Sequence, residues 1–208
     1  YIFRTLVCSP KLTPEGYRIG FARLPEDVND FDFQRIFNYG LALLELLTFK
    51  DECAGYIAVY DLTHLTEEYL GKIDIKLLTE SINLIYNTSP VKVIQSHFLN
   101  VPSISETLIS IAKGLVGQDV LQRVVIHEKP TDLAKCFRKD CLPVEYGGNP
   151  NFKLAEMAEK HKRYVVEDTE LARLRDSLEF VGGLPQHKRQ QYSFEDFELG
   201  NLGRPNVD

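Results

Sequence analysis

Few side chains in this sequence combine a type and a position that could carry out chemistry. Asp61 and Asn100 each follow a segment with the pattern of a buried strand. Open α/β sheets bind ligands at the carboxyl ends of their strands, so the Asp61 carboxylate could act as a general base. It could equally accept hydrogen bonds from the turn that follows the strand. The sequence leaves both interpretations open.

The histidines and cysteines lack a recognisable catalytic or metal-binding spacing. His97 lies in a predicted buried strand and His127 at the end of another, where we expect hydrogen bonds to the backbone. Cys136 and Cys141 have no second pair nearby, so no zinc site is expected, and irregular spacing of the four cysteines favours reduced thiols. Nucleophile-elbow, Walker A and G-x-G-x-x-G motifs are absent. We therefore expect no catalytic residues, no metal and no cofactor, and predict that the protein is not an enzyme.

Two cations stand beside predicted strands. Lys92 comes early in one and Arg123 early in the next. They could be ordinary surface charges. They could also bind one anionic headgroup together, because lysine and arginine suit phosphate.

The elements that would position these residues alternate between strand and helix. Runs rich in β-branched and aromatic residues predict strands at 17–24, 55–62, 91–99 and 121–127. Apolar residues with helical spacing predict helices within 33–50, 65–70, 73–86 and 103–116. This alternation is typical of an α/β fold with a mixed, mostly parallel sheet.

The predicted helix after residue 102 has an unusually wide apolar side. Ser103 and Glu106 have the spacing of a capping box, which starts a helix. Behind them Ile104, Leu108 and Ile111 repeat along one face, and neighbouring apolar residues widen it. Either protein core or a bound ligand must cover such a face, and periodicity does not distinguish the two.

Composition restricts the class of protein. The 208 residues are 44% hydrophobic, which suits one globular core, and the net charge of −6 argues against nucleic acid as a partner. No apolar run is long enough to span a membrane, and the N-terminus lacks the pattern of a secretory signal. We expect a cytoplasmic protein.

Four segments in this order resemble the CRAL-TRIO, or Sec14-like, lipid-binding domain family. They are 55–62, 90–102, 123–127 and 142–148, and two carry specific motifs: His-x-x-Asn-x-Pro from His97 and Leu-Pro-x-Glu-Tyr-Gly-Gly from Leu142. The resemblance implies a mixed sheet that floors a hydrophobic cavity, with helices around it and a helical lid at 104–116. The ending Asn206-Val-Asp208 is similar to that of insect members.

The resemblance also implies which residues bind the ligand. They come from the first long helix, the second and third strands, the intervening helices and the lid: Asn38, Ala42, Tyr56, Ala58, Tyr60, Leu65, Ile73, Leu77, Ser81, Leu84, Ile85, Val93, Ser96, Ile104, Leu108, Ile111 and Val116. In tocopherol-transfer relatives a basic cleft binds a phosphoinositide headgroup. Lys92 and Arg123 match two of its cations, whereas Ile94 and Asp119 replace two others.

The implied function is an intracellular, monomeric carrier. It would bind one retinoid, tocopherol-like isoprenoid or phospholipid and exchange it during transient membrane contact, with phosphoinositide as a further partner. The alternative is a membrane-targeting or protein-interaction module without transfer activity. We expect 1–16 to be a linker or remnant of an N-terminal helical region, 17–149 to be the lipid-binding domain, and 150–208 to be a helix and polar tail packing on it.

Overall fold

Five strands form one sheet, and their order across the sheet is their order along the chain. The computed structural model describes residues 6–102 and 117–167. The first strand pairs antiparallel with the second, and the other neighbours pair in parallel. The predicted α/β fold with a mixed, mostly parallel sheet is confirmed. The strands are β1 (Leu6–Cys8), β2 (Tyr17–Arg23), β3 (Gly55–Asp61), β4 (Val93–Leu99) and β5 (Val124–Ile126).

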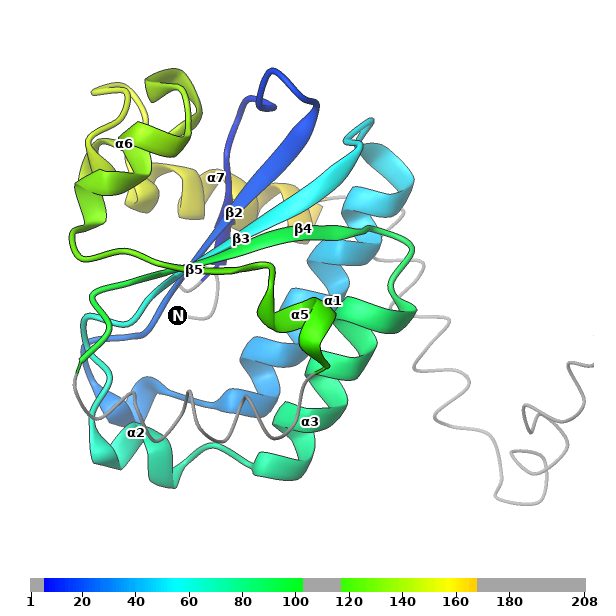
Figure 1. Cartoon of the computed structure of the whole chain (residues 1–208), viewed down its shortest axis with the longest axis vertical. Helices are drawn as coiled ribbons and strands as arrows, with labels where there is room; N and C mark the ends of the chain where they lie inside the picture. Colours follow the sequence, from blue (N-terminus) through cyan, green and yellow to red (C-terminus); the bar gives the residue numbers. More distant parts are fainter. Residues whose placement is uncertain (1–5, 103–116, 168–208) are drawn as a thin grey trace, which may run out of the picture. The chain divides into compact units, whose positions relative to one another are not determined.

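Helices lie on both faces of this sheet. Right-handed crossovers that always step in the same direction place their helices on the same side. Figure 1 shows α1, α2, α3 and α5 on one side, which we call the crossover face, and α6 and α7 on the other, which we call the core face. The helices are α1 (Phe33–Lys50), α2 (Glu67–Gly71), α3 (Ile75–Asn83), α5 (Gln118–Leu121), α6 (Leu133–Cys136) and α7 (Leu154–Glu167).

The core face is closed by apolar side chains. Ile57 and Val59 of β3 are at most 3% exposed and belong to one cluster with Leu133 of α6. Phe21 of β2 stacks on Tyr146 with ring centroids 5.6 Å apart, and further apolar residues from 142–158 complete the cluster. Burial of this much apolar surface is the main stabilising contribution to the domain.

Short helical turns connect the larger elements, and two helices begin and end at other residues than the sequence predicted. They are η2 (Val28–Asp30), η3 (Leu84–Thr88), η4 (Pro130–Asp132), η5 (Lys139–Cys141) and η6 (Val144–Tyr146). The helix predicted at 73–86 begins at Ile75, because the Asp74 side chain caps it by accepting from the Leu77 N–H at 3.0 Å. From Leu84 the chain continues as a π-helical turn. The helix predicted at 65–70 begins at Glu67 and ends at Gly71.

The two ends of the sheet also differ from the sequence expectations. The strand predicted at 121–127 is shorter because residues 118–121 form α5, which buries Val120. Residues 6–8, in the segment expected to be a linker, form β1 and pair with Gly20, Phe21 and Ala22 of β2. Strand β1 therefore belongs to the sheet.

The chain divides into two units after Arg163, and the site described below lies within the first. Among residues 6–102 and 117–167, no helix is both long and apolar enough to cross a membrane.

Candidate ligand-binding face of the sheet

The side chains predicted to bind the ligand from β3 all point to the crossover face. Side chains alternate along a strand, and Ile57 and Val59 pack into the cluster on the core face. Tyr56, Ala58 and Tyr60 therefore point to the crossover face of the sheet, on which Figure 1 shows α1 and α3. The structure brings this part of the predicted set together.

A bulge explains how Val93 and Ser96 of β4 reach the same face. Residues three apart would normally point to opposite sides of a sheet. Here the register shifts by one residue, so Val93 pairs with Tyr56 while Ser96 pairs with Ala58. Both side chains are buried, Ser96 completely. The bulge thus places both on the crossover face.

Small residues form a row across the middle of this face. In register they are Gly20 of β2, Ala58 of β3 and Ser96 of β4. A side chain on Gly20 would collide with the Tyr56 ring, because an ideal Cβ there would lie 1.5 Å from Tyr56 Oη. Glycine at this position lets Tyr56 lie across β2. A glycine within a strand is the signal that could have revealed this close approach from the sequence.

Aromatic hydroxyl groups border the row. The Tyr86 hydroxyl of η3 hydrogen-bonds to Ser96 Oγ, and Tyr56 hydrogen-bonds to Cys8 of β1. Tyr60 stacks on Phe98 with ring centroids 5.0 Å apart. Tyr86, Phe98 and Cys8 were not among the residues predicted to bind the ligand. Phe98 could have been found as the alternate position after Ser96.

These hydroxyl groups are neutral over the physiological pH range. Burial raises the pKa of Tyr56 well above its ordinary value, and the neighbouring Cys8 raises this pKa further. Burial also raises the pKa of Tyr60 and of Tyr86. The same effect raises the pKa of the Cys8 thiol to about 12. The face therefore offers neutral donors and acceptors.

Several predicted residues lie elsewhere or already have polar partners. Asn38 is exposed, and its Oδ1 accepts a hydrogen bond from Gln34 at 3.0 Å. Leu65 and Ile73 pack in a separate cluster around Phe31 and Tyr69. Ser81 is buried, but its hydroxyl donates to the Leu78 carbonyl at 2.7 Å.

The structure describes some of the remaining predicted ligand-binding positions and not others. Leu77, Leu84 and Ile85 are half-buried. The Ala42 side chain and the four positions predicted for the lid lie outside the described residues; these positions are Ile104, Leu108, Ile111 and Val116.

The two predicted headgroup cations have different environments. Lys92 is exposed. Arg123 donates to the Val93 carbonyl at 3.1 Å and forms an ion pair with Asp119 at 3.6 Å. Ile94 packs against the core-face cluster. Asp119 therefore offsets the charge of Arg123.

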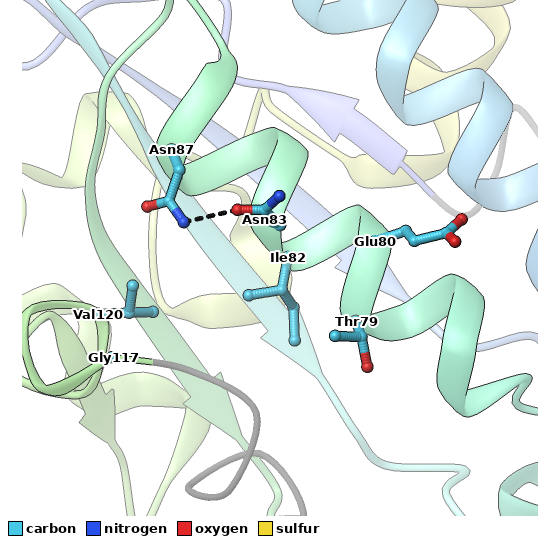
Figure 2. Close-up of a pocket in the computed structure, with 7 residues that line it drawn as sticks. All are labelled: Thr79, Glu80, Ile82, Asn83, Asn87, Gly117 and Val120. Carbon is cyan, nitrogen blue, oxygen red and sulfur yellow. Dashed lines mark hydrogen bonds between the residues drawn. The ribbon is translucent and has the colours of Figure 1, made fainter.

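A separate pocket of ≈ 250 Å³ lies between α3, η3 and α5 (Figure 2). Its lining is mostly polar and includes Thr79, Glu80 and Asn83. Asn87 donates to Asn83 across the helical turn at 2.8 Å. This lining does not suit a hydrophobic ligand as well as the crossover face does.

Comparison with known proteins decides the family. Residues 6–148, more than half of the 208-residue chain, match the CRAL/TRIO domain. This chain belongs to the CRAL/TRIO domain family. No curated protein matches the sequence. The chain is similar to the crystal structure of Sfh5, with a TM-score of 0.58 and 14% identity, over 80% of this chain and 66% of that chain. At this identity the similarity concerns the fold alone, and the chain spans just under two thirds of that protein.

The motifs that distinguish this CRAL/TRIO domain meet at Asp61. Asn100, from His-x-x-Asn-x-Pro, donates to Asp61 Oδ1 at 2.8 Å, and Tyr146, from the second motif, donates to Oδ2 at 3.0 Å. The Thr63 backbone N–H also donates to Oδ1, at 3.1 Å. Asp61 is 4% exposed. Its carboxylate therefore holds the turn after β3, which is the second of the two interpretations of this residue.

The second motif of the CRAL/TRIO domain has a further structural basis. Gly147 has a φ of 78°, a left-handed conformation that favours glycine. Glu145 accepts a hydrogen bond from the Leu154 N–H at 3.1 Å, at the start of α7. A Cβ on Gly148 would lie 2.1 Å from the Leu142 carbonyl oxygen. Each of these residue types is thus explained by packing or backbone geometry.

We expect Tyr146→Phe to lower the free energy of unfolding by about 2 kcal/mol at pH 7, because it removes a buried hydrogen bond to a carboxylate. Burial alone would raise the pKa of Asp61, but hydrogen bonds from Thr63, Asn100 and Tyr146 outweigh it and lower that pKa. The stabilisation is therefore complete above the unfolded pKa of about 3.9 and disappears as the pH falls through the folded pKa.

Urea unfolding of both proteins between pH 7 and pH 3 tests this expectation. The difference between wild type and Tyr146→Phe should shrink as the pH falls below about 4. Asp30→Asn, which changes an exposed aspartate, serves as the control and should leave the pH profile unchanged. A difference that is equally large at pH 3 and pH 7 would contradict a role for ionised Asp61.

Proposed function

We propose that this CRAL/TRIO domain carries one small hydrophobic molecule against the crossover face and exchanges it at membranes. The observation that carries the proposal is the composition of that face. The Tyr56 ring lies over Gly20, the small side chains of Ala58 and Ser96 continue the row, and the Tyr60 ring stacks on Phe98 beside them. Mostly apolar surfaces with a few converging polar groups are typical of lipid-binding sites.

The charges on this face favour a neutral ligand. Its described positions on β3 and β4 carry no charged side chain; they are Tyr56, Ala58, Tyr60, Val93, Ser96 and Phe98. Desolvation of an unpaired ionic group beside them would be costly. A retinoid or tocopherol-like isoprenoid, with a single hydroxyl or carbonyl group, fits better than a molecule whose charged headgroup enters the site. Tyr60 and Tyr86 are the proposed partners of that group.

The proposed membrane exchange does not depend on a phosphoinositide. Of the two cations predicted to bind a phosphoinositide headgroup, Arg123 already contacts Asp119 and a backbone carbonyl. Exposed Lys92 remains available for a general electrostatic contact with anionic lipid. A phosphoinositide in acceptor vesicles should therefore raise the exchange rate no more than another anionic lipid of equal charge density.

A transfer assay between vesicles tests the proposal. Donor vesicles contain retinol. Acceptor vesicles contain a lipid that quenches the fluorescence of retinol when retinol reaches them. Catalytic amounts of the protein should raise the transfer rate at least about tenfold over spontaneous exchange, and heat-denatured protein should not. An unchanged rate for retinol, tocopherol and fluorescent phospholipid alike would refute transfer. If binding is nevertheless detected, the alternative of a targeting or interaction module without transfer is supported.

A further inference from the structure

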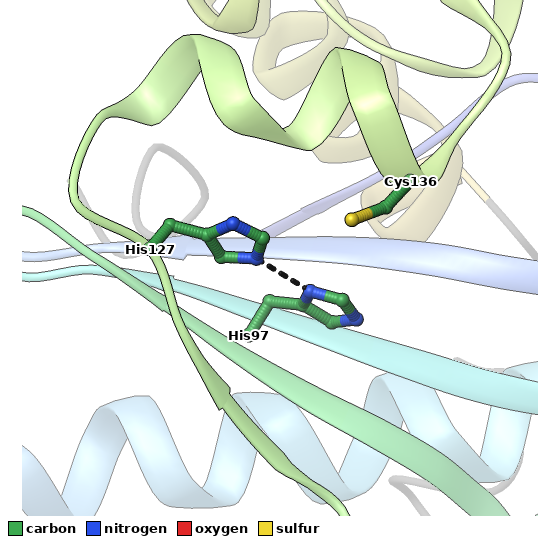
Figure 3. Close-up of side chains that lie close together, drawn as sticks. All are labelled: His97, His127 and Cys136. Carbon is green, nitrogen blue, oxygen red and sulfur yellow. Dashed lines mark hydrogen bonds between the residues drawn. The ribbon is translucent and has the colours of Figure 1, made fainter.

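Three potential metal ligands converge on the core face, away from the proposed ligand face. They are His97 of β4, His127 directly after β5, and Cys136 at the end of α6 (Figure 3). One ligand atom of each lies within 4.8 Å of the others. Sequence spacing relates Cys136 only to Cys141 and leaves each histidine by itself, because 39 positions separate His97 from Cys136. The parallel pairing of β4 and β5 brings the two histidines together, and α6 adds Cys136.

The two imidazole rings are held firmly. His97 is 1% exposed and His127 is 8% exposed, and the rings stack with centroids 5.1 Å apart. Phe137 meets the His97 ring edge-on at 5.0 Å. The His127 backbone N–H donates to the Phe98 carbonyl at 2.9 Å. Cys136 is exposed, so an ion could enter from its side.

Hydrogen bonds assign the proton positions on both rings. Gln95 Oε1 lies 3.2 Å from His97 Nε2 and can only accept, so that nitrogen donates. His97 Nδ1 then carries a lone pair and accepts from His127 Nε2–H at 2.8 Å. Ligating histidines commonly have such an outer hydrogen bond, which fixes the tautomer and aims the other nitrogen at the metal. His97 Nδ1 therefore already has the form that a ligand needs.

We propose that His97 Nδ1, His127 Nε2 and Cys136 Sγ bind one Zn²⁺, with the fourth position open to water. Typical Zn–N distances of about 2.1 Å and Zn–S distances of about 2.3 Å require the two nitrogens to separate to roughly 3.4 Å in a tetrahedron. They are now 2.8 Å apart, so binding requires the two nitrogens to move about 0.6 Å further apart. The Cys136 side chain, at the exposed end of α6, can adjust more freely.

Binding changes the protonation of two ligands. The His127 proton moves from Nε2 to Nδ1, so both imidazoles remain neutral. The Cys136 thiol loses its proton to solvent as its sulfur bonds the metal. One proton is released for each Zn²⁺ bound, and no oxidation or reduction takes place.

The proposed zinc site does not depend on the proposed carrier function. Ser96 and His97 are adjacent in β4 and point to opposite faces, so loss of the metal should leave the crossover face intact. The site joins β4, the end of β5 and α6. Bound Zn²⁺ should consequently raise the thermal midpoint of the domain, because it binds the folded state.

Cobalt and zinc titrations of the tag-free, chelator-treated full chain test the proposal. One Co²⁺ per chain should give a thiolate-to-cobalt charge-transfer band and be displaced by one Zn²⁺. Cys136→Ser should abolish the band and lower the affinity for Zn²⁺ at least about 100-fold, since loss of an outer hydrogen-bond partner alone can lower metal affinity by up to that factor. His127→Gln should lower the affinity for Zn²⁺ by a similar factor. Cys53→Ser, which alters another accessible cysteine, is the matched control and should bind like wild type.

Two results would overturn the zinc site. One is a wild-type chain that shows no thiolate band with Co²⁺. The other is Zn²⁺ affinity that Cys136→Ser and His127→Gln both leave within about twofold of wild type, which would place the ion elsewhere. Circular dichroism of each variant verifies folding. Cys136→Ser should leave the rate in the vesicle assay unchanged, so this assay distinguishes failure of the zinc site from failure of the carrier function.

Discussion

Ala58→Phe is expected to prevent ligand loading while the protein remains folded. Ala58 is 5% exposed and lies in the row of small residues between Gly20 and Ser96 on the crossover face. If a ligand occupies the space above this row, a phenyl ring will occupy the same space. We expect at least a tenfold loss of bound retinol and a thermal midpoint within a few degrees of ligand-free wild type.

Val59→Phe is the matched control on the next residue of the same strand. Val59 is 1% exposed and faces the closed cluster on the core face. Interiors are packed too densely to admit such an increase, so we expect a loss of about 3 kcal/mol or failure to fold. Fluorescence titration with retinol and thermal unfolding distinguish the two variants. If Ala58→Phe destabilises the protein as much as Val59→Phe does, the crossover face is ordinary packed core and not a binding site.

Gly148→Ala is expected to lower the free energy of unfolding by about 3 kcal/mol. The added Cβ would lie 2.1 Å from the Leu142 carbonyl oxygen and 2.4 Å from its carbon, and these backbone atoms cannot rotate away. The Gly148 N–H donates to the Pro143 carbonyl at 3.0 Å, and the Asn149 N–H donates to the Leu142 carbonyl at 2.9 Å. Displacement of this loop would weaken both hydrogen bonds and the packing of the adjacent core-face cluster.

Gly71→Ala is the control for Gly148→Ala. Gly71 ends α2, and a Cβ there meets nothing within 4 Å. We expect a change of no more than about 0.5 kcal/mol, of the size of ordinary surface substitutions. Urea unfolding measures both. Equal stabilities for the two variants would show that the close approach at Gly148 is not energetically important.

The sequence predicted the sheet well because its central strands are strongly patterned. The strand at 55–62 is apolar on both sides, and the structure buries it between two layers of helices. The edge strands were harder to predict. Residues 6–8 are too short to show a period, and Leu121, predicted to begin the last strand, instead ends α5.

The family resemblance, and not the alternation of residues, predicted that Val93 and Ser96 belong to one site. Alternation alone would have separated Val93 from Ser96, and only the bulge between them puts both on one face. Gly20 and Cys8 join the face through pairing with distant strands, which a single sequence does not specify. The His97, His127 and Cys136 cluster could not be predicted for the same reason. Its donors come from three elements with no common spacing.

The motifs that suggested the family describe the scaffold more than the binding face. Asn100 and Tyr146 both donate to buried Asp61, and His97 contacts His127. The expectation that the two histidines bond to the backbone was wrong for His97, whose ring contacts the His127 ring and the Gln95 side chain. Residues that identify the fold therefore do not specify which molecule the crossover face accepts.

Native mass spectrometry of freshly purified full chain tests the central claim most directly. If the crossover face holds a hydrophobic ligand, wild-type protein should carry one non-covalent molecule per chain, released on denaturation and identifiable by its fragments as a neutral lipid. Ala58→Phe purified in parallel should show the mass of the polypeptide alone. Wild-type protein with only its polypeptide mass after expression in several hosts, and after incubation with retinol, tocopherol and phospholipid, would contradict the account.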